Sequence, residues 1–385
     1  MTEQRAIVSG GGIGGLAAAV SLARTGWHVT VLEQAAVFWE AGAGLLVTRN
    51  GWRCLERIGA ADAVIADGAV VRNLGVRDLD GGWVLQFADG PDLQAIGVHR
   101  RALHSALLEC AAAQERITLL PGCRVIDAAP GQDRGAQATV VWLEDGETRV
   151  GHADLLVIAD GAQSALRRTV DSAPTVSSGF SSWRAVVDDA VWPEATAQTW
   201  WGPGAEFSAQ AIGGGKACWQ ATFRHDAGRG FGDDRSAARE RFRDWPETVQ
   251  DLVAATADGM LVRHDLFEVR PDAQTFVTGR AVLLGDAAHA MLPTLFQGAN
   301  QALEDAVVLG HCLSRGLELG RALAEYDAQR RERTQKVAHW ARAVTERGAG
   351  GGGRSIVGWM QAAGVTPGRS LKRAQRIFGW EPPTG

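Results

Sequence analysis

The chain has 385 residues, 46% of them hydrophobic and 22% charged, a composition typical of a globular enzyme with one large or two smaller domains. Its net charge of −5 argues against general binding to nucleic acids, and no apolar run reaches the ~18 residues of an integral membrane span. Five scattered cysteines and nine histidines show no disulfide or metal-ligand spacing, and the N-terminus shows no signal-peptide pattern. We therefore expect reduced thiols, no metal and a cytoplasmic location.

A strand, a glycine-rich turn, a helix and a second strand are predicted in succession over residues 5–33. The turn has the spacing Gly-x-Gly-x-x-Gly, and Glu33 closes the second strand, 21 positions after Gly12. Such a turn lets a helix N-terminus receive a pyrophosphate, and the acid can bond the ribose hydroxyls of FAD or NAD but disfavours NADP. The alternative is a glycine-rich turn with a solvated Glu33. The predicted cofactor contacts are Gly10, Gly12, Ile13, Gly14, Gly15 and Glu33.

The middle of the chain shows several further elements. Helical periodicity is found at 50–59 and 101–113, a strand pair or meander is expected over 117–145, and a buried strand over 154–158. From residue 179 onward the sequence becomes strand-like and rich in tryptophan.

Residues 179–270 are predicted to form a mixed β-sheet. Alternation along two adjacent strands gathers polar side chains on one face, and we take these as pocket candidates: Glu206, Ser208, Gln210, Cys218, Gln220 and Thr222. The alternative is that this face is solvated. The tryptophans of this region are more typical of a core than of a pocket. Arg184 is a further candidate, for an acidic group of the substrate, although a surface or inter-strand ion pair is the favoured interpretation.

The C-terminal part opens with a buried strand at 281–284 and the stretch GDAAHAMLPTLFQG at 285–298. Long helices are predicted at 299–316 and 321–347, followed by a glycine-rich hinge at 348–353. The basic tail after it is expected to be an amphipathic helix that closes the domain, rather than a segment that docks a partner.

Three stretches resemble the signatures of the group A flavoprotein monooxygenases, the single-component FAD-dependent aromatic hydroxylases. Residues 154–167 (DLLVIADGAQSALR) resemble the family's strand–DG–S–R segment, and residues 99–103 (HRRAL) resemble its R-x-x-L segment, which places Arg100. The stretch beginning GDAAHAMLP resembles the second FAD-binding signature. The signatures come in the family order, and the resemblance spans residues 5–310.

The resemblance implies an α/β fold in three parts. These are a Rossmann-like FAD-binding domain of the GR2 type (1–175 and 275–347), an inserted mixed β-sheet substrate domain (176–274) and a C-terminal helical tail (348–385). It also implies noncovalent FAD and NAD(P)H as a cosubstrate that needs no second glycine-rich domain. The implied reaction inserts one oxygen atom of O₂ into an aromatic or polycyclic small molecule, by hydroxylation or epoxidation through a C4a-hydroperoxyflavin.

The resemblance assigns further residues to the cofactor. Asp286 ends a buried strand, where open α/β sheets bind ligands, and its carboxylate can accept bonds from ribityl hydroxyls. The helix that follows can stabilise negative charge on the reduced flavin. Asp160 contacts the pyrophosphate and the nicotinamide path, caps the following helix, or does both. His289 is expected to hold its loop by a hydrogen bond. The implied contacts are Gly44, Arg100, Val125, Asp160, Gly285, Asp286, Gly298, Ala299 and Asn300.

The loop at 293–298 departs from the family pattern at Phe296, where glycine is common. Phenylalanine does not readily take a positive φ, so we expect the loop to bend elsewhere or the ring to fill space. Pro293 and Phe296 are therefore candidates for the pocket wall, with packing of Phe296 into the core as the alternative. Tyr326, the one tyrosine, lies in a late helix, so activation of a phenol by tyrosine is not expected.

Two other functions stay open at this point. One is a flavin-dependent halogenase or reductase on the same scaffold, although the W-x-W-x-I-P signature of halogenases is absent. The other is a non-catalytic, nucleotide-bound module. The yellow colour of FAD and the consumption of O₂ during NAD(P)H oxidation would separate these alternatives.

Overall fold

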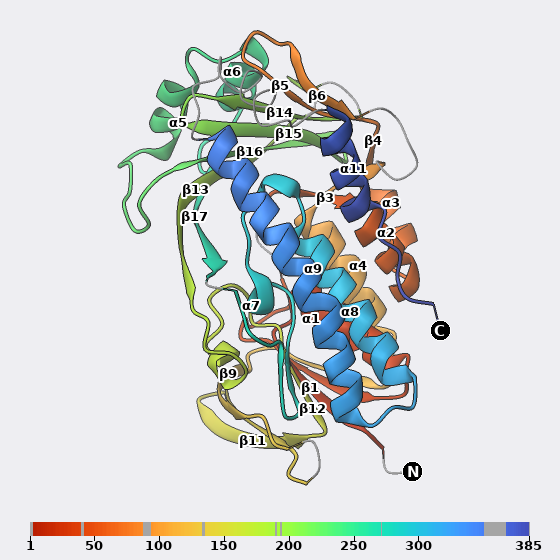
Figure 1. Ribbon diagram of the computed structural model, residues 1–385. Coiled ribbons are helices and arrows are strands. Elements are labelled where there is room, and N and C mark those ends of the chain that lie inside the picture. The colour runs from red at the N-terminus through yellow and green to blue at the C-terminus, as the bar shows by residue number, and fades with distance from the viewer. Residues whose placement is uncertain are drawn as a thin grey trace.

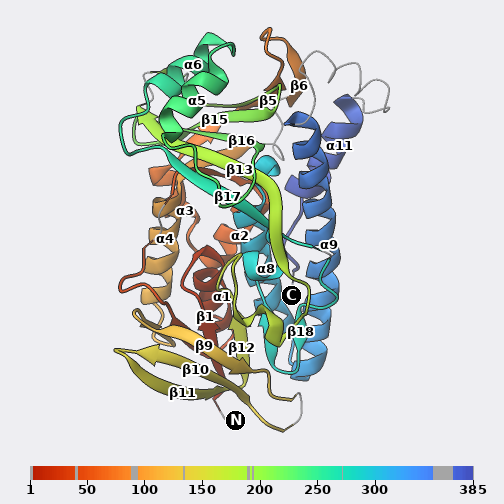
Figure 2. The same cartoon turned by 90° about the vertical axis from the view of Figure 1, so that its left-hand side faces the viewer.

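The computed structural model describes residues 3–39, 42–87, 94–132, 135–188, 191–192, 195–270, 272–349 and 367–384. Figures 1 and 2 show two sheet-based parts stacked one above the other. The long helix α9 (Leu319–Gly348) runs along both of them.

The lower part is built on a six-stranded sheet with the order β18-β19-β12-β1-β2-β8. Neighbouring strands are parallel except for β18, which pairs antiparallel with β19. Strands covered on both faces are almost wholly apolar, which explains the short hydrophobic runs of the sequence. The strands are β1 (Arg5–Ser9), β2 (His28–Leu32), β8 (Ile117–Leu120), β12 (Leu155–Ile158), β18 (Val277–Thr278) and β19 (Ala281–Leu283).

Helices and a β-meander cover opposite faces of this sheet. On β1, Val8 lies beside Gly15 of the first helix, whereas its neighbour Ile7 lies beside Gly151 of the meander, because successive side chains point to opposite faces. The arrangement confirms the predicted Rossmann-like fold of the GR2 type. The elements are the helices α1 (Ile13–Ala23), α4 (Arg100–Ala112) and α8 (Gly298–Ser314), and the meander β9 (Arg124–Ala129), β10 (Ala138–Glu144) and β11 (Glu147–Ala153).

The upper part is a seven-stranded mixed sheet with the order β17-β13-β16-β15-β14-β5-β6. Its pairs are antiparallel except for β14 and β5, which are parallel. The helices α5 (Asp234–Phe242) and α6 (Glu247–Ala254) cover its outer face. The strands are β5 (Asn73–Arg77), β6 (Trp83–Phe87), β13 (Thr175–Asp188), β14 (Thr196–Gly202), β15 (Ala205–Gly213), β16 (Lys216–Arg224) and β17 (Val262–Val269).

The tryptophans of this sheet form its core, as expected. Trp183 and Trp219 are at most 1% exposed and pack with Phe207 and Phe242 beneath the two outer helices. The ring of Trp219 stacks on that of Phe207 with centroids 5.1 Å apart. The aromatic side chains therefore lie on the face of the sheet that points away from the lower part.

Two strands of the upper sheet come from an earlier stretch of chain than the predicted substrate domain. β5 and β6 lie within residues 73–87, whereas the prediction places only residues 176–274 in this sheet. The predicted meander over 117–145 is also divided, because β8 joins the parallel sheet. A small sheet with α2 (Arg49–Ile58) and α3 (Ala61–Asp67) lies between the parts, and its strands are β3 (Gly44–Thr48), β4 (Ala69–Val71) and β7 (Ala95–His99).

The C-terminal helix α11 (Pro367–Phe378) closes against α9, as predicted for the basic tail. Ala374, Ile377 and Phe378 are buried against Val337 of α9. The predicted glycine hinge begins at the end of α9, and its residues 350–353 lie outside the described part of the chain. The remaining short elements are η2 (Leu166–Thr169), α7 (Asp286–His289) and η4 (Pro293–Leu295).

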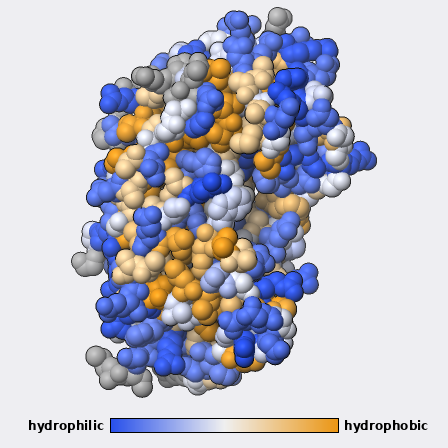
Figure 3. All heavy atoms as spheres, turned by 180° about the vertical axis from the view of Figure 1, so that it is seen from behind, coloured by the Kyte–Doolittle hydropathy of each residue, from blue (hydrophilic) through white to orange (hydrophobic). Residues whose placement is uncertain are grey.

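The surface seen from behind carries hydrophobic patches among a majority of hydrophilic residues (Figure 3). None of the described helices is both long and apolar enough to span a bilayer. Within the described residues no group of three or more histidines, cysteines or carboxylates could hold a metal ion, and all five cysteines are free thiols.

Candidate active site

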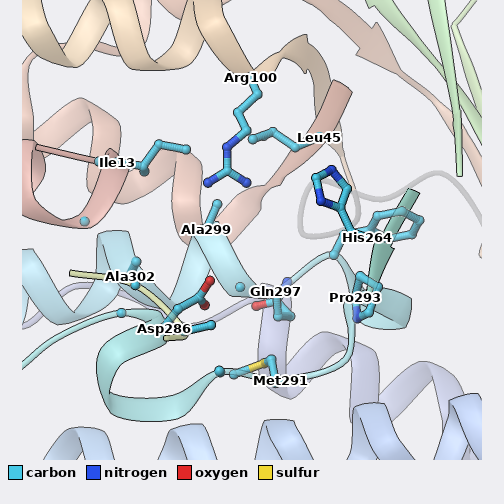
Figure 4. Close-up of a pocket in the computed structure, with 18 of the residues that line it drawn as sticks. Ile13, Leu45, Arg100, His264, Asp286, Met291, Pro293, Gln297, Ala299 and Ala302 are labelled. Carbon is cyan, nitrogen blue, oxygen red and sulfur yellow. The ribbon is translucent and has the colours of Figure 1, made fainter. Parts of the chain in front are cut away.

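A cavity of about 360 Å³ opens between the carboxyl edge of the parallel sheet and the inner face of the upper sheet (Figure 4). In that view Asp286 and Ala299 lie on one side of the cavity, His264 and Pro293 lie on the other, and Arg100 points into it. The cavity is lined by these residues predicted from the sequence: Gly12, Ile13, Gly14, Gly44, Arg100, Arg184, Gln210, Gln220, Gly285, Asp286, Pro293, Phe296, Gly298 and Ala299.

The glycine-rich turn at the cavity has no room for side chains. Gly10 has a φ of +105°, and a Cβ atom there would lie 2.4 Å from the carbonyl oxygen of Ala159. A Cβ atom on Gly15 would lie 1.9 Å from the carbonyl oxygen of Gly10. Gly12 is the N-cap of α1, so the free N–H groups of that helix open toward the cavity. Gly10 and Gly15 thus shape the turn without lining the cavity themselves.

The Glu33 carboxylate holds this turn in place from outside the cavity. It accepts the backbone N–H groups of Gly11 and Ala35, each at 2.8 Å. The contact of Glu33 with a ribose stays a prediction. The structure shows a second role for this carboxylate, which is to hold the glycine-rich turn by hydrogen bonds.

Val125, Asp160 and Asn300 also lie outside the cavity. Val125 packs on β9 against the main core. Burial raises the pKa of Asp160, and hydrogen bonds from Ser164 and from backbone N–H groups of the next turn oppose this rise. These bonds are the ones that its predicted capping role requires. The Asn300 side chain accepts the N–H of Thr48 at 3.1 Å and donates to a backbone carbonyl of β3, so it joins α8 to β3.

Asp286 follows a sharp turn at the end of β19. Gly285 has a φ of +63°, and its N–H donates to Asp305 at 2.9 Å. The Asp286 side chain then points into the cavity, next to the first residues of α8, Gly298 and Ala299 (Figure 4). A carboxylate that accepts hydroxyl groups and a helix N-terminus that attracts negative charge therefore face the same space.

His289 lies outside this cavity and is bound within the protein. It is 3% exposed, and its Nε2 lies 2.6 Å from Oδ2 of Asp305. This geometry supports its predicted structural role, because the bond joins α7 to α8 beside the Asp286 turn.

Gly44 brings the backbone of β3 against the upper sheet. A Cβ atom on Gly44 would lie 2.4 Å from the Ile212 side chain and 2.8 Å from Cβ of Cys218. Cys218 therefore packs behind β3 instead of facing the cavity, contrary to its prediction as a pocket residue. Burial raises the pKa of its thiol to about 11.

The predicted polar face of β15 is buried, not solvated. Glu206, Ser208 and Gln210 are each 3% exposed, yet only Gln210 lines the cavity. Residues on one face of a strand are spaced by about 6.6 Å, so Glu206 sits ~13 Å further along β15 than Gln210. It accepts the indole N–H of Trp201 at 3.0 Å, and Ser208 donates to a backbone carbonyl of β16. The pocket prediction is thus wrong for Glu206 and Ser208, and also for Thr222 of β16, which does not line the cavity.

Arg184 lines the cavity and lies opposite Gln220 across the β13–β16 pair. The favoured prediction of a surface or inter-strand ion pair is wrong, because the Nε atom is buried without a hydrogen-bond partner. Burial, and next the charge of Arg100, lower the pKa of Arg184 to about 10. The guanidinium stays protonated at neutral pH.

Several lining residues were missed from the sequence, among them Leu45, Met291, Gln297 and His264. His264 lies on β17, whose sequence VRHDLFEV lacks the polar–apolar alternation of the two strands on which the candidates were sought. Burial, and next the charges of Arg184 and Arg100, lower the pKa of His264, so its ring is neutral at neutral pH.

Phe296 adopts the left-handed conformation that was expected to require a glycine. Its φ is +56° and its ψ is +27°, so the loop keeps the bend and does not shift it elsewhere. The ring lines the cavity and also packs against Leu46, Val71 and Ala197, so both predicted roles are present. The backbone is held by Asn300, which donates to the Phe296 carbonyl at 2.6 Å.

Replacing Phe296 with glycine and with alanine should separate its backbone strain from its ring. Both variants lose the ring, but we expect the glycine variant to be more stable by ~1 kcal/mol, because only glycine takes this φ freely. Both variants should keep FAD and release more peroxide per NAD(P)H oxidised. Chemical unfolding and a peroxide assay measure the two effects. An alanine variant as stable as the glycine variant would contradict the strained backbone.

Comparison with known proteins places this geometry among flavoenzymes. A family model described as FAD binding domain matches residues 3–341. Aurachin C monooxygenase/isomerase from Stigmatella aurantiaca is 35% identical over 336 residues, which cover 85% of either chain. FAD-dependent urate hydroxylase from Klebsiella pneumoniae is 32% identical over 352 residues, or 88% of either chain. The crystal structure of Klebsiella pneumoniae HpxO complexed with FAD and uric acid matches with a TM-score of 0.82 and 29% identity, over 97% of this chain and 96% of that one.

Proposed function

This chain belongs to the family of FAD-dependent aromatic monooxygenases, and we propose that its substrate is a small aromatic compound whose ring carries an acidic O–H or N–H group. The family establishes the reaction class, in which FAD, NAD(P)H and O₂ serve to insert one oxygen atom into an organic substrate. The charge of the cavity supports the substrate class.

The residues around the cavity fit FAD. The crowded glycine turn leads into the N-terminus of α1, which suits a pyrophosphate, and Asp286 offers an acceptor for hydroxyl groups. Gly298 and Ala299 open a second helix N-terminus toward the same space. When bound, FAD supplies the redox chemistry that activates O₂. The protein groups bind and orient the cofactor and the substrate.

Arg184 is the observation that carries the substrate class. Buried polar groups almost always have partners, so an unpaired guanidinium Nε at a cavity wall points to an anionic partner from outside the protein. A guanidinium fork matches a carboxylate or a ring oxyanion. Gln210 and Gln220 line the same wall, and their amides can bond ring oxygen and nitrogen atoms.

The relatives are consistent with such a substrate. The Klebsiella structure contains uric acid, and other relatives are 3-amino-4-hydroxybenzoate 2-monooxygenase from Streptomyces cremeus and 3-hydroxybenzoate 6-hydroxylase from Polaromonas naphthalenivorans. All three named compounds carry acidic ring groups, which supports the proposal for this chain.

We expect Arg184→Gln to raise KM for acidic aromatic compounds by about ten- to a hundredfold, because one charge-assisted bond contributes about 1.5–3 kcal/mol. The measurement is NAD(P)H oxidation by the holoenzyme with uric acid, 3-hydroxybenzoate and 3-methoxybenzoate, the methyl ether that lacks the acidic ring O–H. Arg224→Gln is the matched control, since Arg224 ends β16 and lies over the Phe180 ring, outside the cavity. A parent enzyme that prefers the ether to 3-hydroxybenzoate would overturn the proposed class.

We also infer that the enzyme works in the cytoplasm. All five cysteines are free thiols, four of them buried, as is usual for proteins of a reducing compartment. Secretion into an oxidising compartment in a fractionation experiment would contradict this.

A further inference from the structure

His264 presents an accessible imidazole to the cavity from the substrate side. Its ring points toward the space that Arg100 enters from the opposite wall (Figure 4). On the sheet, His264 lies opposite Ser182, and Arg184 is two positions further along β13. Diagonal neighbours of this kind are about 7–8 Å apart and point to the same face, within reach of long side chains.

A row of polar side chains crosses the inner face of the upper sheet from His264. The strand register places His264 opposite Ser182, Ser182 opposite Thr222, and Thr222 opposite Glu206. Directly opposite residues on neighbouring strands point to the same face with Cβ atoms about 4.5–5.5 Å apart. We name these four residues the polar row.

The interior of the polar row is buried and its hydroxyl groups have no protein partners. Ser182 and Thr222 are at most 1% exposed, and neither hydroxyl forms a hydrogen bond with any described residue. Burying a hydroxyl without a hydrogen bond costs free energy, so buried hydroxyls of this kind usually bind ordered water that links them to nearby polar groups. They lie between an imidazole and a carboxylate on the polar inner face of the sheet.

Glu206 ends the polar row as a buried carboxylate. Its bonds come from Trp201 and Thr294, and no described cation forms an ion pair with it. Burial raises its pKa to about 7, so it both accepts and releases a proton near neutral pH. The Thr294 hydroxyl lies 2.6 Å from that of Thr345 on α9, which continues the hydrogen-bonded path away from the cavity.

We propose that His264 removes the acidic ring proton of the substrate and that the polar row carries this proton to Glu206. The proposal deepens the proposed function and rests on its acidic substrate. The O–H or N–H bond of the substrate breaks, its electron pair stays on the ring, and an N–H bond forms on the imidazole. The imidazolium then returns its proton through Ser182, Thr222 and bound water to the Glu206 carboxylate.

The charges around His264 favour passage of the proton onward to Glu206. Burial, with the positive charges of Arg184 on β13, Arg100 on α4 and Arg263 on β17, lowers the pKa of the imidazole, so the ring is neutral before transfer and readily gives up a proton that it receives. The two arginines that line the cavity, Arg184 and Arg100, also stabilise the substrate anion. Asp265 opposes them only weakly, because its carboxylate already accepts Ser181 and the N–H of Gly228. An electron-rich anion is also the form of an aromatic ring that an electrophilic oxygen attacks most readily.

Other described bases are poorly placed for this proton. Tyr326 is fully buried and donates to the Leu283 carbonyl at 2.9 Å. Asp286 lies on the cofactor side of the cavity (Figure 4). Among the described residues that line the cavity, this leaves the His264 imidazole as the unengaged base on the substrate side.

The test is the pH profile of kcat/KM for His264→Gln and Thr222→Val with 3-hydroxybenzoate or uric acid, whichever the parent holoenzyme oxidises. Below the pKa of the compound we expect a loss of ~100-fold or more for His264→Gln, the usual contribution of a general base. The loss should shrink as the compound ionises in solution. Thr222→Val should show a smaller loss with the same pH dependence, and Thr222→Ser should restore the parent profile.

Matched controls separate this role from packing. Thr199→Val removes a buried hydroxyl of the same sheet outside the polar row, and His152→Gln removes a histidine of the meander; both should match the parent profile. A parent-like profile of His264→Gln, or an equal loss at every pH, would overturn the role of His264. A parent-like profile of Thr222→Val would overturn the relay. A parent that binds neither acidic compound would instead overturn the proposed substrate class, which a binding titration of the oxidised holoenzyme detects separately.

Discussion

Replacing Arg330 with methionine should lower the free energy of unfolding by about 3–5 kcal/mol, because it removes the fully buried cation that Glu304 and Asp305 share, even though Arg333 still contacts Glu304. Arg330 is 1% exposed, and its Nε donates to Asp305 at 2.6 Å while its Nη1 donates to Glu304. Both carboxylates are fully buried. Urea unfolding of the FAD-bound enzyme, followed by circular dichroism, measures the loss.

The same variant should loosen the cofactor turn. Burial alone would raise the pKa of Asp305, but His289 and next Arg330 hold it at about 2. Oδ2 of this carboxylate, which His289 also contacts, accepts the N–H of Gly285, directly before Asp286, while Arg330 binds Oδ1. Since the folded pKa lies below the ordinary value of 3.8, this carboxylate stabilises the fold above pH ~4, and its contribution is lost as the pH falls toward 2. The variant should therefore bind FAD more weakly as well as unfold more easily.

Arg331→Met on the same helix is the matched control. Arg331 pairs with Asp327 at 3.1 Å near the surface, where such a pair contributes about 0–1 kcal/mol. Equal losses in the two variants would contradict the role assigned to the buried network.

Replacing Glu33 with alanine should weaken FAD binding by about ten- to a hundredfold. The change removes the predicted ribose contact and also frees the Gly11 and Ala35 N–H groups that the carboxylate now accepts. Bonds to an ionised acceptor contribute about 1.5–3 kcal/mol, and each 1.4 kcal/mol corresponds to tenfold in affinity. Titration of the apoprotein with FAD, followed by the quenching of flavin fluorescence, gives the dissociation constant.

Glu33→Gln distinguishes the two roles of this side chain. The amide keeps the size and one acceptor oxygen, so it should support the glycine turn but bind the ribose less strongly than the carboxylate does. We expect its affinity to lie between those of the parent and the alanine variant. An alanine variant that binds FAD as tightly as the parent would remove Glu33 from both roles.

Features that depend on neighbouring residues in the chain were predictable from the sequence. The glycine turn of residues 10–15 was recognisable because a strand, a crowded bend and a helix N-terminus require glycine at fixed spacing. The position of Asp286 directly after β19 was recognisable for a similar reason, because the buried apolar run of this strand ends at Gly285. These local rules, with the family resemblance, led to the FAD-binding fold and to most of the cofactor side of the cavity.

Phe296 shows where such a local rule fails. Phenylalanine disfavours a positive φ on its own, and that preference predicted a different bend. In the structure its ring packs against Leu46 and Val71 and its carbonyl accepts Asn300, contacts that come from residues distant in the chain. Packing of this kind outweighs a backbone cost of about 1–2 kcal/mol.

The substrate side was decided by tertiary structure. Alternation along β15 showed correctly that Glu206 and Gln210 lie on the same face of the strand. Which of the two lines the cavity depends on the elements of the lower part that pack over each end of β15. The pairing of His264 with Ser182, and of Thr222 with Glu206, follows from a strand order that brings together segments up to 82 residues apart. The sequence by itself thus determined the cofactor cradle and the face on which each polar residue lies. The buried, unpaired Nε atom of Arg184 and the alignment of the polar row required the stacked sheets, because neighbours across a sheet are chosen by long-range pairing that leaves no local pattern.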